Sequence, residues 1–90
     1  MDYEDEMKIS IKEIIEDLNS RIESIEKGIA YYTELIELKK KHCKSTLTED
    51  DILSALKTEK ITTENIKSNI KDILYNNDVP EEYYEIKEEE

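Results

Sequence analysis

The chain has 90 residues, of which 41% are charged and 37% hydrophobic, and its formal net charge is −11. Ninety residues form one domain, near the lower size at which a chain buries enough apolar surface to fold alone. The single glycine and single proline cannot supply the turns that a β-sheet requires, so an all-α fold is expected.

The negative charge is concentrated at the two ends of the chain. Residues 1–7 carry four carboxylates and no cation, and residues 78–90 carry seven carboxylates and one lysine. The segment between them holds 12 basic and 13 acidic residues and is nearly neutral. Acidic ends repel duplex nucleic acid, so direct nucleic-acid binding is not expected, whereas a basic protein surface would attract them. The sequence therefore divides into an acidic N-terminal segment (1–7), a helical domain (8–77) and an acidic tail (78–90).

The first predicted helix spans residues 8–43 and carries a heptad pattern. Its apolar residues recur at alternating steps of four and three, which is typical of a helix that packs along a narrow stripe. Gly28 is followed by no capping residue and the pattern stays in phase across it, so the helix is expected to continue there, with a local cost of about 1 kcal/mol. Beyond it, Tyr31, Leu35 and Leu38 widen the apolar face. The stripe, called the seam below, consists of Ile11, Ile15, Leu18, Ile22, Ile25, Ile29, Tyr32 and Ile36.

Two short helices are predicted next, over residues 49–58 and 63–76, because the segment contains two similar starts. Thr48 and Thr62 each suit an N-cap, and each has an apolar residue directly before it and another four positions after it. The Asn-Asn-Asp-Val-Pro run at 76–80 ends the last helix. The expected fold is therefore one long heptad-patterned helix followed by a short two-helix hairpin.

Helix lengths decide how this fold would be completed. The first helix is about 54 Å long, whereas the two short ones reach only about 15 and 21 Å. They would leave the seam from Ile11 to Ile25 uncovered, which is an aggregation hazard. We therefore expect a helical bundle completed by self-association or by a partner, as a homo-oligomer or a hetero-complex with a larger protein through the first helix. Parallel and antiparallel pairing both stay open, because a surface ion pair such as Arg21 with Glu26 contributes at most about 1 kcal/mol.

The candidate chemical groups each have an ordinary structural explanation. His42 and Cys43 are neighbours on a helix and point about 100° apart, so neither readily activates the other. The acidic run 49–51 suits the first turn of a helix and lacks the glycine and spacing of a calcium loop. The basic run 39–44 suits a helix C-terminus, and a helix-turn-helix built from the two short helices would have few cations. We expect no enzymatic activity, no cofactor and no metal, and we do not favour helix-turn-helix DNA binding.

The acidic tail, 78–90, has a composition typical of disorder, and its expected role is to keep the protein soluble. A sharper alternative is a short linear motif in which Tyr83, Tyr84 and Ile86 dock while the carboxylates steer the tail toward a basic groove. Nucleic-acid-binding enzymes have such grooves. This alternative describes the chain as an acidic inhibitor or nucleic-acid mimic.

The leading hypothesis is a non-enzymatic helical protein that mediates protein–protein interaction, as an accessory or regulatory subunit of a larger complex. A nucleic-acid-processing complex is one such setting. The N-terminus is acidic where a signal peptide would be basic and then apolar, and no apolar run has the length of a membrane span. Cys43 is the only cysteine, so no intrachain disulfide forms. A cytoplasmic location without a membrane partner is expected.

Overall fold

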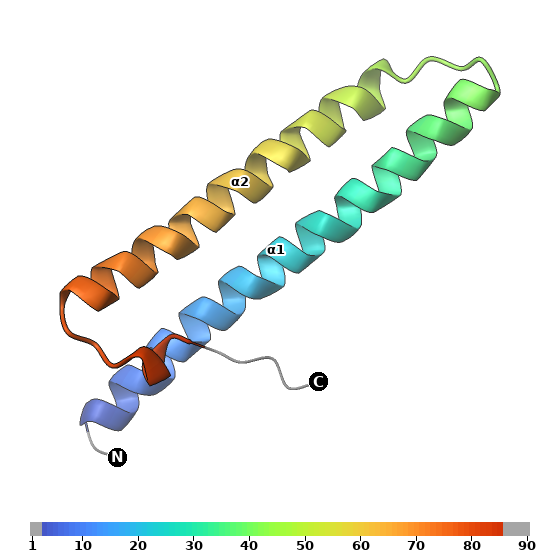
Figure 1. Ribbon diagram of the computed structural model, residues 1–90. Helices are drawn as coiled ribbons and strands as arrows, with labels where there is room; N and C mark the ends of the chain where they lie inside the picture. Colours follow the sequence, from blue (N-terminus) through green and yellow to red (C-terminus); the bar gives the residue numbers. More distant parts are fainter. Residues whose placement is uncertain (1–2, 86–90) are drawn as a thin grey trace.

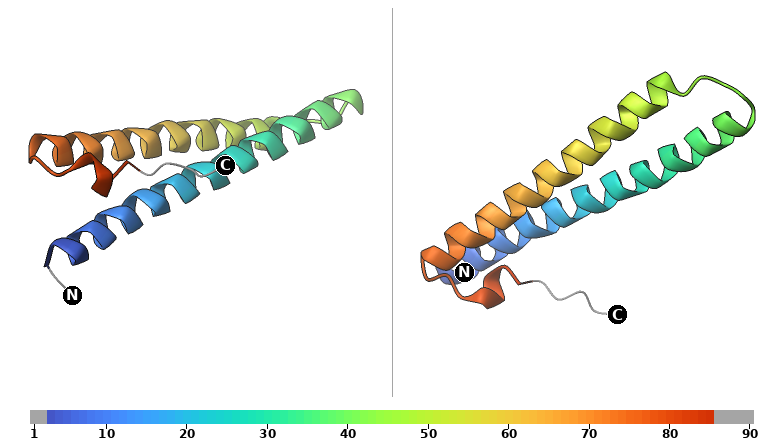
Figure 2. Two further views of the ribbon diagram at one scale, coloured as in Figure 1. Left: turned by 60° about the horizontal axis from the view of Figure 1, so that its bottom comes forward. Right: turned by 45° about the horizontal axis from the view of Figure 1, so that its top comes forward.

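The computed structural model describes residues 3–85 and shows two long antiparallel helices followed by a short helical turn (Figure 1). Helix α1 spans Tyr3–Lys41, helix α2 spans Leu47–Asn76 and the 3-10 helix η1 spans Glu81–Tyr83. No strand occurs within residues 3–85, which confirms the all-α prediction. The two further views agree that α1 and α2 run side by side and that η1 returns to the N-terminal end of α1 (Figure 2).

Helix α1 is continuous through Gly28, as predicted. A Cβ atom at Gly28 would lie 3.3 Å from Cδ1 of Leu56, so the missing side chain lets α2 pack close to α1 at this point. The helix begins at Tyr3 rather than at residue 8, where the acidic residues of the first turns favour the positive end of the helix dipole. The N-terminal segment 1–7 is therefore helical from residue 3.

Both long helices end in a Schellman motif without glycine. Cys43 and Asp78 take the left-handed position after the helix, with φ of 54° and 59°. This is why α1 ends at Lys41 and not at residue 43. The closing bonds run from the amide of Lys44 to the carbonyl of Lys39 (2.9 Å) and from the amide of Val79 to the carbonyl of Leu74 (3.0 Å).

The predicted pair of short helices, 49–58 and 63–76, is wrong: the structure has one helix, Leu47–Asn76, in their place. The segment between them contains neither glycine nor proline, so nothing interrupts the backbone bonds. The threonines read as helix starts are accommodated inside α2; the hydroxyl of Thr63 donates to the carbonyl of Glu59 at 2.8 Å. A helix-turn-helix motif is therefore absent from this segment, because α2 contains no turn.

The start of α2 also differs from the prediction. Thr46, not Thr48, is the residue before the helix, and the amide of Asp50 donates to its carbonyl at 2.8 Å. The Thr46 hydroxyl donates to the Asp50 carboxylate at 2.9 Å and makes no capping bond to a backbone amide. The predicted cap is therefore displaced by two residues.

The longer α2 changes how the seam is covered. Ile15, Leu18, Ile25 and Ile36 are buried, and the other four seam residues are half-buried. The expectation that the N-terminal half of the seam lacks cover from its own chain is therefore wrong. The buried and half-buried positions of α2 include a row that also follows steps of four and three; its members are Glu49, Leu53, Leu56, Lys60, Thr63, Lys67, Ile70 and Leu74.

The first part of the predicted disordered tail is folded. Tyr83 and Tyr84 form a buried cluster with Ile15, against which residues near the ends of both long helices pack. Ile86 and the carboxylates after it lie outside the described residues. The packed residues are Met7, Ile11, Ile70, Leu74 and Val79.

Candidate interaction surface

Two helices packed along one seam leave a flank on each side, and the two flanks of this hairpin differ in polarity. In an antiparallel pair, the residues directly beside the seam on one side of α1 adjoin the equivalent residues of α2. We call one side the polar flank; it is formed by Asn19, Glu26 and Thr33 of α1 with Lys57, Glu64 and Lys71 of α2. We call the other the apolar flank; it is formed by Ile14, Arg21, Gly28 and Leu35 of α1 with Ile52, Glu59, Ile66 and Ile73 of α2.

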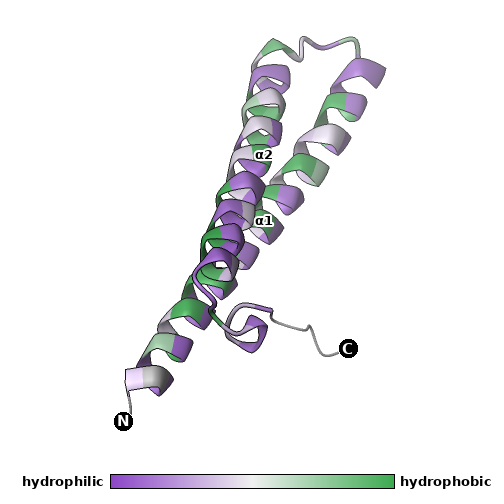
Figure 3. Cartoon of the chain, turned by 60° about the vertical axis from the view of Figure 1, so that its left-hand side comes forward, coloured by the Kyte–Doolittle hydropathy of each residue, from purple (hydrophilic) through white to green (hydrophobic). Residues whose placement is uncertain are grey.

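Shallow grooves on the two sides support this assignment. On the apolar flank, Arg21 and Ile25 line one groove together with Glu59 of the other helix. On the polar flank, Ile22 lines a groove together with Glu64 and Lys67. Hydrophobic and hydrophilic stretches also alternate along both helices when the chain is coloured by hydropathy (Figure 3).

The apolar flank exposes large aliphatic side chains on both helices. Ile14 is 49% exposed, Ile66 45% and Ile73 60%. Tyr31 and Leu38, which were predicted to widen the seam, are exposed on the side of α1 next to this flank. A run of exposed aliphatic residues along one side of a hairpin is typical of a binding surface.

Charged groups are distributed differently on the two flanks. On the polar flank, Lys60 lies 3.7 Å from Glu26 and 3.8 Å from Glu64, so an ion pair connects the two helices. On the apolar flank, Arg21 pairs, among the described residues, only with the exposed Asp17 of its own helix at 3.6 Å, a type of contact that contributes little. Glu59 has no cation within ion-pair distance among residues 3–85.

The loop end of the hairpin is joined by an ion pair between Lys39 and Glu49. The hydrogen bond from the Lys39 ammonium, followed by a backbone hydrogen bond, lowers the pKa of Glu49 from its ordinary value near 4.5. A carboxylate whose pKa is lowered on folding stabilises the fold above its unfolded pKa, and this contribution disappears as the pH falls through the folded pKa.

We therefore expect the thermal midpoint of the wild-type chain to fall more steeply below pH 4.5 than that of Glu49→Gln. Circular dichroism melts between pH 6 and pH 3 would measure the difference. Glu37→Gln removes an exposed carboxylate at the same end of α1 and is the matched control, which should keep the wild-type profile. Superimposable profiles for wild type and Glu49→Gln would contradict the assigned role of the ion pair.

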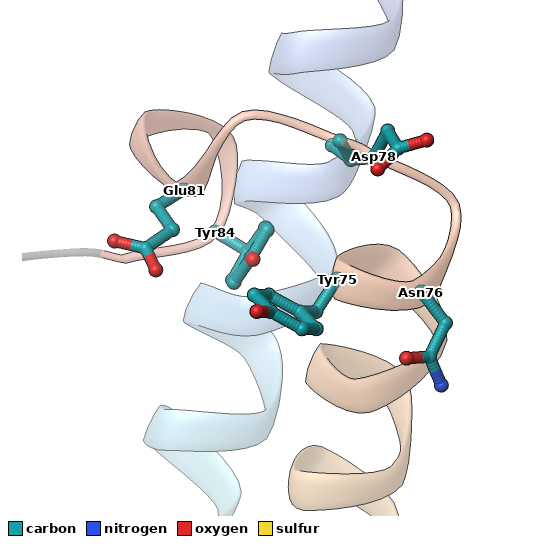
Figure 4. Close-up of a pocket in the computed structure, with 6 residues that line it drawn as sticks. Tyr75, Asn76, Asp78, Glu81 and Tyr84 are labelled. Atoms are coloured by element: carbon teal, nitrogen blue, oxygen red, sulfur yellow. The ribbon is translucent and has the colours of Figure 1, made fainter.

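The opposite end of the hairpin is closed by the cluster of Tyr83 and Tyr84. Figure 4 shows Tyr84 between η1 and α1, next to the ring of Tyr75 at the end of α2. Burial, followed by the nearby Glu81 and Glu85 carboxylates, raises the pKa of Tyr84 above its ordinary value, so the phenol stays neutral. Lys71 holds Glu85 at 3.4 Å. These contacts attach the segment after α2 to the hairpin.

The other sequence-based candidates do not come together into one site. The seam residues are on the side of α1 that packs against the rest of the chain, and all eight are buried or half-buried, so they do not form a free surface. His42 and Cys43 are exposed in the turn after α1. No group of three or more histidine, cysteine, aspartate or glutamate side chains is arranged to hold a metal ion within the described residues, and Glu49 instead pairs with Lys39. Tyr83 and Tyr84 are buried, while Ile86 lies outside the described residues.

Comparison with protein families, curated proteins and solved structures finds no match to this chain. No helix within residues 3–85 is long and apolar enough to cross a membrane. The surface of the hairpin is therefore the feature from which a function can be inferred. The apolar flank was missed from the sequence, although Ile52, Ile66 and Ile73 recur there at multiples of seven.

Proposed function

We propose that this chain is a non-enzymatic protein–protein interaction protein that acts as an accessory or regulatory subunit and binds through the apolar flank. The observation that carries the proposal is the contrast between the two sides of one hairpin. Ile14, Ile66 and Ile73 are about half exposed on one side, whereas ion-paired Lys60 and Glu64 occupy the other. Covering the aliphatic side removes apolar surface from water, which is the main driving force for association.

The proposal differs from the sequence-based hypothesis in the surface that it uses. The seam residues pack inside the hairpin, so binding through them would require α1 and α2 to separate. The apolar flank is available while the hairpin stays intact. The alternative of an acidic inhibitor depended on free tyrosines in the tail, and docking through Tyr83 and Tyr84 would first require η1 to detach. The flank is therefore the better-supported surface.

Site-specific photo-crosslinking in the native host would test the proposal. A photoreactive amino acid at position 66 samples the apolar flank, and one at the exposed position 57 samples the polar flank as a matched control. We expect discrete protein adducts from position 66 and none from position 57. Adding Ile73→Glu to the position-66 variant should abolish the adducts, because a carboxylate on the flank resists burial. Absence of adducts at 66, or equal adducts at both positions, would contradict the proposal.

A further inference from the structure

We infer that the apolar flank is covered by a second copy of this chain, docked antiparallel on the first, so that two hairpins form a four-helix bundle. This inference rests on the proposed function and identifies the partner at the same surface. It is carried by the order of charged and aliphatic residues along the flank and by the distribution of charge between the two ends of the hairpin.

The register of the hairpin determines which flank residues are level with one another. Lys60 meets Glu26, and Gly28 lies against Leu56, so residue numbers rise along α1 as they fall along α2. This register gives four levels along the flank. They are Ile14 with Ile73, Arg21 with Ile66, Gly28 with Glu59, and Leu35 with Ile52.

These four levels are self-complementary about their midpoint. A two-fold axis that crosses the flank at the midpoint, perpendicular to the helices, exchanges the outer levels with each other and the inner levels with each other. Ile14 of one copy then lies over Leu35 of the other, so aliphatic residues meet at both ends. Arg21 lies over the second copy's Gly28, where no side chain obstructs it, beside the second copy's Glu59. Two equivalent ion pairs result.

The parallel arrangement lacks this match. A two-fold axis along the hairpin keeps every level opposite itself, so Arg21 faces the second copy's Ile66 and Glu59 faces the second copy's Gly28. The charges of opposite sign are then one level, or about 10 Å, apart along the axis. Each charge would be covered without a partner, which is costly in an interface.

The ends of the hairpin favour the same orientation. The end that contains the start of α1 and η1 carries several carboxylates, among them Asp5, Glu6, Glu81 and Glu82. The loop end carries Lys39, Lys40, Lys41 and Lys44 against Glu37, Glu49, Asp50 and Asp51, so it is close to neutral. Antiparallel docking places the acidic end of one copy near the nearly neutral end of the other, whereas parallel docking places the two acidic ends together, where they repel each other.

The single native cysteine provides a direct test of orientation. Cys43 is exposed in the loop, so it can carry a spin label without any other substitution. In the antiparallel dimer the two labels lie at opposite ends. The rise per residue of an α-helix places them about 55 Å apart. In a parallel dimer both lie at the same end. Double electron–electron resonance on the full chain should give the long distance, and a distance below about 30 Å would overturn the arrangement.

Sedimentation equilibrium tests the dimer itself. We expect a species of twice the 10.7 kDa chain mass and, for Ile66→Glu, a dissociation constant raised at least about 100-fold, because the symmetric interface is altered twice. Ile61→Glu, on the outer side of α2, is the matched control and should keep the dimer. Circular dichroism would verify that both variants remain helical.

Charge exchange tests the predicted ion pairs. Arg21→Glu and Glu59→Arg should each weaken the dimer about tenfold or more, and the double variant should restore it, because each new pair again joins opposite charges. Failure of the double variant to restore association would overturn the pairing. A chain that stays monomeric at high concentration would overturn the inference altogether. Crosslinks from position 66 to a different protein would then still support the proposed function, so the two failures are distinguishable.

Discussion

Replacing Ile15 by alanine is expected to lower the free energy of unfolding by about 2–5 kcal/mol, because the side chain is only 1% exposed and its loss leaves a cavity. Ile15 joins Tyr83 and Tyr84 in the buried cluster, where α1 meets the end of α2 and the segment after it. Removing it therefore weakens contacts among three parts of the chain. In a protein of this size such a loss is a large fraction of the total stability.

Urea denaturation followed by circular dichroism would measure the effect of Ile15→Ala. All samples should have the same protein concentration, because self-association makes the apparent free energy of unfolding depend on concentration. The matched control is Ile9→Ala, which truncates the same residue type on the exposed side of the same helix. It should change the free energy of unfolding by less than about 1 kcal/mol. Equal losses for the two variants would show that the cluster is not a centre of stability.

Replacing Tyr84 by alanine should detach η1 and expose the N-terminal turns of α1. The ring is 3% exposed and forms part of the buried cluster, so its removal is expected to lower the thermal midpoint by about 10 °C or more. Hydrogen exchange should show a second effect, namely faster exchange of the Met7 and Ile11 region, which packs against the cluster.

Tyr3→Ala is the matched control for this variant, because Tyr3 is 76% exposed on the same end of α1. It should leave both the midpoint and the exchange pattern near the wild-type values. If Tyr84→Ala left the exchange of residues 7–11 unchanged, the segment after α2 would not be a structural cover for α1.

The sequence predicts α1 well because its seam is apolar at every position. Isoleucine, leucine and tyrosine at alternating steps of four and three leave one helical face to bury, and a single Gly28 does not outweigh that preference. The continuity of the helix and the burial of Ile15, Leu18 and Ile25 follow from this pattern. What covers them depends on α2, whose pattern is less regular.

The length of α2 was missed because polar residues occupy the middle of its inner face. Lys60, Thr63 and Lys67 sit where an apolar repeat would be expected, and the threonines near residue 62 resemble a helix start. Lysine can bury its aliphatic stem against a neighbouring helix while its ammonium reaches water, so the face still packs. The heptad spacing indicates one continuous helix, because Leu56 and Ile70, on either side of the predicted turn, are two heptads apart.

The ends of the helices and the tail could not be read from composition. Cys43 and Asp78 occupy left-handed positions that usually indicate glycine, so no glycine marked either motif, and only the run at 76–80 indicated a helix end. The charged surroundings of Tyr83 and Tyr84 resemble a disordered tail, because composition does not show that two aromatic rings can fill the open end of a hairpin. Local backbone hydrogen bonds close the helix ends, and tertiary packing orders the first part of the tail.

The ion pair between Lys60 and Glu26 has a consequence for the alignment of the two helices. A polar residue in a helical core position restricts how neighbouring helices slide past each other. If α2 slid by seven residues in either direction, Lys60 would lie beside Asn19 or Thr33 in place of Glu26. Both shifted alignments would place a neutral side chain at the position of Glu26, so the observed alignment of the helices is preferred. The lysine makes the core less apolar and also makes the pairing of the two helices more specific.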